Sequence, residues 1–228
     1  MTSEAQDISR AVVCWLEYMS LTGMSGLFSE ASLAVPIAEF LSRKHGDEIK
    51  SEVAHPQFDK GSKGRPRQID FVREAKGKNR WHAAFECKFQ KSSLPDVIND
   101  VCRLLCLSQD NGIPCSDRYF VFARKLGETK QLFDKEINVG SARQSAFHKI
   151  LLQQEINRDE NNSFKISDLH QKQQDAFKKF SKEYNAQLPS QIVTKLCGFS
   201  QGLEYACAIW RISSEKGSKL LTLGDDPN

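Results

Sequence analysis

The sequence predicts an α/β protein with a mixed central β-sheet flanked by helices. Two strands joined by a polar turn are expected between Arg67 and Gln90, where apolar and polar residues alternate. A helical pattern over residues 93–109 and an apolar run over residues 118–124 follow. A strand, a long helix and a further apolar strand are typical of a crossover that makes the two strands parallel. The chain, 228 residues with 39% hydrophobic and 27% charged side chains, is long enough to bury a sizeable core.

Two helices and a strand are expected before this hairpin. Apolar residues recur at helical spacing over residues 6–20, and the GMSG turn at residues 23–26 ends that helix. A second helix begins within residues 29–34 and runs to the KHG segment. Residues 48–58 alternate enough to form a strand that ends at or before Pro56. The order is then helix, helix, three-strand meander, helix, strand.

The helix after the hairpin has a clear start signal. Ser93 is placed as its N-cap, with a proline near the first turn and Asp96 three residues after the cap. Apolar residues provide its buried face to about Gln109. The apolar run RYFVFAR that follows is expected at the centre of the sheet, covered on both faces.

The C-terminal part is expected to add helices and a hairpin. The expected elements are a helix (141–156), a polar loop (158–163), a helix with an apolar stripe from Leu169 to Tyr184, two strands (191–196 and 204–212) around a turn (198–202), and a loose tail after Ser214. We treat residues 1–228 as a single domain with its core at about 29–124 and an extension at about 141–214.

Three charged residues stand out in the hairpin, because charge inside an apolar strand is costly unless a metal or a partner compensates it. Asp70 lies on the first strand, and Glu86 and Lys88 lie on the second. Side chains alternate along a strand, so Glu86 and Lys88 point to the same face. The apolar residues of that strand share the other face: Trp81, Ala83, Phe85, Cys87 and Phe89. The hairpin is therefore interpreted as a metal-dependent active site.

Charge is distributed unevenly along the chain. From Lys60 to Lys91 there are ten Lys or Arg against three acids, a local charge of +7 in a chain whose net charge is +3. A basic stretch around carboxylates suits a polyanion that reaches a metal, although a solvated basic loop is the alternative for residues 60–67.

The cysteines and the apolar runs indicate where in the cell the protein is expected. The seven cysteines form no CxxC pair and have no histidine at zinc-finger spacing, so buried, reduced thiols are expected. No apolar run approaches the length that crosses a bilayer, and the first ten residues lack the features of a secretory signal. The protein is expected in the cytoplasm, without membrane contact.

These residues and this element order resemble the PD-(D/E)xK nuclease superfamily, which has the restriction-endonuclease-like fold. Asp70 in QIDFV matches the family's aspartate, and the segment AAFECKF matches the acid-x-lysine motif through Glu86 and Lys88. Ile69 replaces the proline for which the family is named, a position that varies widely in the superfamily. The resemblance covers roughly residues 29–124.

The resemblance implies a metal-dependent nuclease. Asp70 and Glu86, with the backbone carbonyl of Cys87, would bind Mg²⁺ or Mn²⁺, both of which prefer oxygen ligands. Lys88 would orient or deprotonate the attacking water and stabilise the charge that develops on the phosphate. Glu30 on the preceding helix would bind a metal-linked water or a second ion.

Some assignments stay open at this point. Glu39 is the alternative to Glu30, and His55 and His82 have the chemistry for proton transfer, although lone histidines are usually structural. Candidate nucleic-acid contacts flank the motif: Lys63, Arg65, Arg67, Gln90 and Lys91. DNA is the expected substrate, with a role in restriction, defence or repair, and a homodimer would suit cleavage of two strands. An inactive nucleic-acid-binding or protein-interaction module on the same fold is the alternative function.

Overall fold

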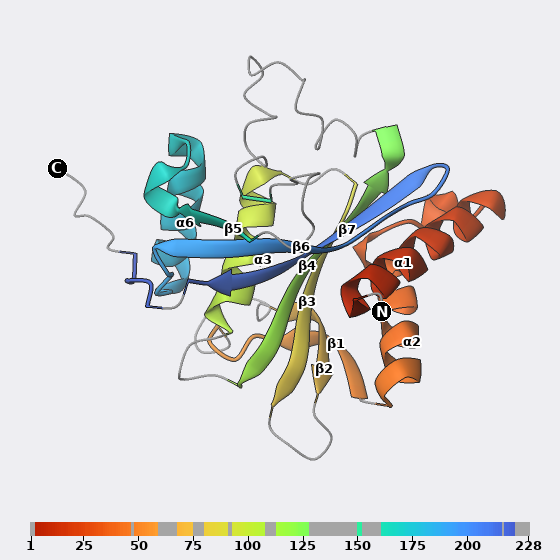
Figure 1. Cartoon of the computed structure of the whole chain (residues 1–228), viewed down its shortest axis with the longest axis horizontal. Helices are drawn as coiled ribbons and strands as arrows, with labels where there is room; N and C mark the ends of the chain where they lie inside the picture. The colour runs from red at the N-terminus through yellow and green to blue at the C-terminus, as the bar shows by residue number, and fades with distance from the viewer. Residues whose placement is uncertain are drawn as a thin grey trace.

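The computed structural model describes residues 3–46, 48–58, 68–74, 80–90, 93–107, 113–127, 150–151, 161–215 and 217–221. The helices are α1 (Glu4–Leu21), α2 (Ala34–His45), α3 (Leu94–Cys106) and α6 (Gln171–Tyr184), with 3-10 turns η1 (Ser25–Leu27), η2 (Glu30–Leu33) and η3 (Ile166–Asp168). The strands are β1 (Glu48–Ala54), β2 (Gln68–Glu74), β3 (Trp81–Phe89), β4 (Cys115–Lys125), β5 (Asn162–Lys165), β6 (Gln191–Gln201) and β7 (Tyr205–Ser214). Within this part of the chain the strands form one seven-stranded sheet with helices on both faces (Figure 1). The predicted α/β class with a mixed sheet is confirmed.

The strand order in the sheet is β1-β2-β3-β4-β7-β6-β5. β3 and β4 are parallel, whereas each other pair of neighbours is antiparallel. The crossover from β3 to β4 runs through α3, as the strand-helix-strand pattern predicted. The site residues of β2 and β3 therefore lie beside the central strand.

Two hydrophobic layers cover the sheet, one on each face. On one face α1 and α2 pack against β3 through residues that include Leu16, Ile37 and Phe85. On the other face α3 and α6 pack against β4 and β7. The apolar run of β4 contributes Val121 to the first layer and Phe120 to the second, so β4 is covered on both faces as expected.

Helix α3 begins where its cap signal predicted. Ser93 Oγ accepts the Asp96 N–H at 3.3 Å, and Asp96 Oδ2 accepts the Ser93 N–H at 3.2 Å, which completes a capping box. The cap fixes the residue at which α3 begins.

The C-terminal part is more than an extension of the core. β7 pairs with β4 over seven residue pairs from Tyr119–Arg211 to Lys125–Tyr205, so it continues the sheet past its central strand. The N-terminal helix α1 then packs on β6 and β7, which joins the two ends of the chain (Figure 1). The sheet therefore needs residues from both halves of the sequence.

The turn predicted at residues 198–202 is wrong. β6 continues through Gly198 to Gln201, with a register shift between Leu196 and Gly198. A Cβ on Gly198 would lie 2.3 Å from the backbone oxygen of Ala5, so this glycine permits the close approach of β6 to α1. Gly198 is thus a packing glycine, and β6 and β7 are joined at residues 202–204 instead.

The segment before β5 and the tail after β7 also differ from the predictions. The predicted loop at 158–163 runs into the edge strand β5, which pairs with β6. The tail after Ser214 is not loose as far as Leu221, because the Leu221 N–H donates to Leu188 O at 2.7 Å and Pro189 bridges to Leu220. The predicted helix over 141–156 lies outside the described residues except for Ile150 and Leu151.

The packing of Trp81 and the burial of some cysteines also differ from the predictions. Trp81 packs in the layer with α3, whereas Ala83, Phe85, Cys87 and Phe89 lie in the layer with α1, because the β2–β3 register shifts between Arg73 and Glu74. All seven cysteines are described and free; four are buried as expected, whereas Cys14 is exposed and Cys115 and Cys197 are partly buried. Among the described helices, none has the length and apolar character needed to span a membrane.

Candidate active site

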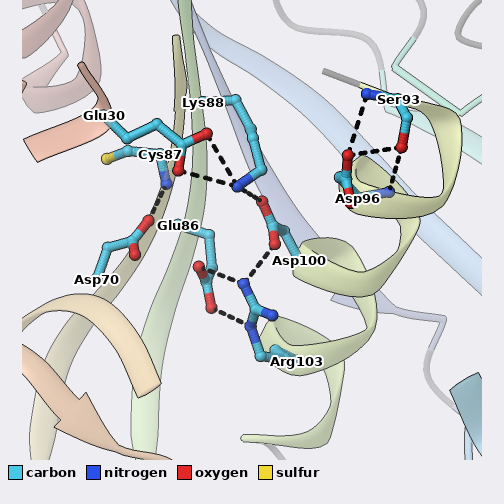
Figure 2. A network of polar contacts seen from close by, with 9 residues as sticks. All are labelled: Glu30, Asp70, Glu86, Cys87, Lys88, Ser93, Asp96, Asp100 and Arg103. Carbon is cyan, nitrogen blue, oxygen red and sulfur yellow. Dashed lines mark hydrogen bonds and ion pairs between the residues drawn. The ribbon is translucent and has the colours of Figure 1, made fainter. Parts of the chain in front are cut away.

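The antiparallel pairing of β2 with β3 brings the motif residues together. Phe71 pairs with Phe85 and Val72 with Ala84, so Asp70 and Glu86 are the next residues along the two strands. Because alternate residues share a face, Glu86 and Lys88 lie on the same face as Ala84, toward α3. In Figure 2, Lys88 and Glu86 face Asp100 and Arg103 of α3, and Asp70 lies beside Cys87. The alternation in the sequence predicted this shared face.

Asp70 is tied to the backbone of the neighbouring strand. Its Oδ2 accepts the N–H of Cys87 at 2.7 Å, while the Cys87 side chain packs on the opposite face with the α1 layer. Within the described residues no hydrogen bond involves Oδ1 of Asp70. One oxygen of this carboxylate therefore orients the side chain, and the other is available to a ligand.

Glu86 is fully buried and paired with an arginine of α3. Its Oε1 lies 2.7 Å from Arg103 Nε, and its Oε2 lies 3.0 Å from Arg103 Nη2 (Figure 2). Burial raises the pKa of Glu86 well above its ordinary value, and the charge of Arg103 opposes that rise. Both oxygens that were predicted to hold a metal are thus bound by a guanidinium in this structure.

Lys88 lies between two carboxylates. Its Nζ is 3.0 Å from Asp100 Oδ2 and 3.2 Å from Glu30 Oε1. Burial alone would lower the pKa of Lys88, but Asp100 and Glu30 outweigh it and raise that pKa. Lys88 is consequently a cation at neutral pH, suited to stabilising negative charge rather than to accepting a proton from water.

The structure distinguishes the two candidate carboxylates of the second helix. Glu30, at the start of η2, contacts Lys88, and its side chain is 46% exposed. Glu39 lies one helical turn from Arg43 on α2 and pairs with it at the exposed surface. The site therefore contains Glu30, and it is open to solvent on the Glu30 side.

Two residues of α3 belong to the site and were not predicted. Asp100 contacts both Lys88 and Arg103, and it is 2% exposed. Burial raises the pKa of Asp100 to about 6, against the opposing charges of Arg103 and Lys88. A signal was present in the sequence, since Asp100 occupies the same helical stripe as Val97 and Leu104.

The charges of the site do not balance. Four carboxylates surround two cations: Glu30, Asp70, Glu86 and Asp100 with Lys88 and Arg103. When all six groups are ionised, the net charge is −2. Carboxylate oxygens and this charge suit a divalent cation such as Mg²⁺. Among the described residues, however, no three His, Cys, Asp or Glu side chains are arranged to hold a metal, and both oxygens of Glu86 are bound by Arg103.

The predicted nucleic-acid contacts lie mostly outside the described residues. Lys63, Arg65, Arg67 and Lys91 are in this group. Gln90 is described and half-buried; its φ is 60°, and its N–H donates to Ala123 O at 2.9 Å. Its backbone thus turns away from the strand direction directly after the motif.

His55 lies next to the site and has a structural role. It is fully buried and stacks on Phe58; its Nε2 lies 3.0 Å from the backbone oxygen of Arg103, and its Nδ1 accepts the Gln57 N–H at 3.2 Å. Burial lowers the pKa of His55 to about 4. The neutral imidazole therefore connects the end of β1 to the α3 residue that binds Glu86.

This histidine predicts a pH dependence of stability. Because its pKa is lower in the folded state than in the unfolded chain, the unfolded chain binds the proton first, and stability is lost as the pH falls from about 6.5 to about 4. The shift corresponds to about 3 kcal/mol. Asp100, whose pKa is raised, acts in the opposite direction below pH 6. We expect urea unfolding at pH 4 to 7 to show a steeper loss of stability toward low pH in the wild type than in His55→Gln; parallel curves would contradict this.

The resemblance to PD-(D/E)xK nucleases stays a prediction from the motif residues Asp70, Glu86 and Lys88 and from the order of the elements that carry them. No known protein family, curated protein or solved structure matches this chain.

Proposed function

We propose that this protein is a metal-dependent nuclease that hydrolyses phosphodiester bonds of nucleic acid, with DNA as its substrate. The observation that carries the proposal is the gathering of Asp70, Glu86, Lys88 and Glu30, from β2, β3 and η2, around a buried carboxylate at a site that is open to solvent on the Glu30 side. Carboxylate oxygens can bind a divalent ion for metal-assisted phosphoryl chemistry, and a lysine beside them can stabilise the charge that develops on the phosphate.

Each residue has a defined part in this proposal. Asp70 and Glu86, with the Cys87 carbonyl, would hold Mg²⁺ or Mn²⁺, which would polarise the scissile phosphate and lower the pKa of a bound water. Lys88 carries its positive charge next to that place and would donate a hydrogen bond to a phosphate oxygen. Glu30, on the exposed side of the site, pairs with Lys88; its Oε1 lies 3.2 Å from Lys88 Nζ.

Several features support a nucleic-acid substrate. The local charge of +7 between residues 60 and 91 would attract a phosphate backbone to the site. The resemblance favours DNA and a role in restriction, defence or repair. A homodimer would place two such sites on the two strands. The seven free cysteines agree with a cytoplasmic location, where thiols stay reduced.

The contact between Arg103 and Glu86 favours a second candidate function. If that bidentate pair is permanent, Glu86 cannot bind a metal, and the chain would be an inactive nucleic-acid-binding or protein-interaction module on the same fold. The two candidates differ in one measurable property, which is cleavage.

The test is incubation of the purified protein with supercoiled plasmid, linear duplex, single-stranded DNA and RNA, in Mg²⁺, Mn²⁺ or EDTA. We expect DNA cleavage in the presence of the metal ions and none in EDTA. Asp70→Asn, purified in parallel, controls for contaminating nucleases and should be inactive. Binding without cleavage in both metals would support the inactive module instead.

A further inference from the structure

Arg103 occupies the carboxylate that the proposed function assigns to the metal ion. Its guanidinium binds both oxygens of Glu86, and the same group contacts Asp100 Oδ1. Glu86 is fully buried and the Arg103 side chain is 14% exposed, so this pair is shielded from water. A bidentate arginine pair is among the strongest contacts that a carboxylate makes in a protein.

The surrounding charges explain why a cation is needed at this place. Glu86 lies near Asp70 and Asp100, and each of these neighbours disfavours its charged form. A buried carboxylate in such surroundings requires a positive partner, which a guanidinium or a divalent ion can supply. The two partners would occupy the same oxygens, so they exclude each other.

We propose that Arg103 competes with the divalent cation for Glu86, and that release of Arg103 from Glu86 limits the metal affinity of the site. The proposal rests on the proposed nuclease function, because it takes Glu86 as a metal ligand. Asp100 supplies the second position for Arg103, since Nη2 already contacts Asp100 Oδ1 while it binds Glu86. Arg103 can thus leave Glu86 and remain paired on α3.

The test is the affinity for Mn²⁺ itself, measured by calorimetric titration of the full chain without nucleic acid. Removing the competitor in Arg103→Met is expected to tighten the apparent dissociation constant about 10- to 100-fold, the range that corresponds to a charged hydrogen-bonded contact. Arg211→Met is the matched control. Arg211 forms a 2.7 Å pair with Asp117 on β4, away from the site, and its removal should leave Mn²⁺ affinity unchanged.

Thermal unfolding provides a readout that is independent of titration. In Arg103→Met the buried Glu86 has no guanidinium, so Mn²⁺ should raise the melting temperature of this variant more than that of the wild type, relative to EDTA. If Arg103→Met does not fold, Arg103→Lys takes its place. Lysine keeps the charge but not the bidentate contact, and this variant should also bind Mn²⁺ more tightly than the wild type.

The outcomes separate this inference from the proposed function. Metal-dependent cleavage by the wild type, together with unchanged or weaker Mn²⁺ binding in both Arg103 variants, would overturn the competition and leave the nuclease standing. Absence of both Mn²⁺ binding and cleavage in the wild type, with no gain in the variants, would overturn both.

Discussion

Replacing Lys88 by methionine is expected to reduce kcat for DNA cleavage by about 10²- to 10³-fold, the usual effect of removing one donor that stabilises transition-state charge. Methionine keeps most of the side-chain volume and removes only the ammonium group. KM should change less, because the other nine Lys and Arg residues between Lys60 and Lys91 would remain to attract the proposed DNA substrate. Steady-state cleavage of a short labelled duplex in Mg²⁺ measures both constants.

The control for this substitution is Lys44→Met. Lys44 lies on α2, on the opposite side of the sheet, where its Nζ is 3.9 Å from Asp7. The Lys44→Met variant also loses one ammonium group, yet its cleavage rate should equal that of the wild type. Circular dichroism must show that Lys88→Met is folded, because Asp100 and Glu30 lose their shared partner. Full activity in a folded Lys88→Met protein would exclude Lys88 from the catalytic site.

Replacing Arg103 by methionine is expected to destabilise the protein by about 3 to 5 kcal/mol in EDTA, because it leaves Glu86 buried without a partner. Glu86 has no exposed surface through which water could solvate the lone carboxylate. The contact with Asp100 is lost in the same substitution. Urea unfolding followed by circular dichroism at pH 7 gives the free energy of unfolding of variant and wild type.

Two further variants identify the cause of that loss. In Glu86→Gln/Arg103→Met the carboxylate is neutralised, so most of the lost stability should return. Arg43→Met removes an arginine from the exposed pair with Glu39 on α2 and should cost less than about 1 kcal/mol. Equal losses in the single and double Arg103 variants would show that packing of the arginine stem, rather than the unpaired charge, is responsible.

Local patterns in the sequence predicted much of the fold. The start of α3, the hairpin of β2 and β3 and the parallel crossover to β4 follow from a cap signal, from alternation and from an apolar run. Predictions were wrong where one residue type serves two purposes. Gly198 reads as a turn residue, but its lack of a side chain serves the contact between β6 and α1.

Arg103 and Asp100 illustrate the same limit within the site. Spacing alone places Asp100 on the apolar stripe of α3 with Val97 and Leu104, which indicates the buried face. It does not indicate which side chains of the sheet this face meets, because that depends on how α3 packs. Only the packing of α3 against β3 decides that Asp100 and Arg103 contact Lys88 and Glu86.

The sequence by itself determined that Glu86 and Lys88 share a face of the sheet, because alternation along a strand is a property of the local backbone. It also placed Asp70 on the adjoining strand, within reach of that face. The tertiary structure decided that Glu30 rather than Glu39 contacts Lys88, and that an arginine from α3 binds Glu86. These contacts join segments that are distant in the chain, and the packing of helices on the sheet sets which side chains meet.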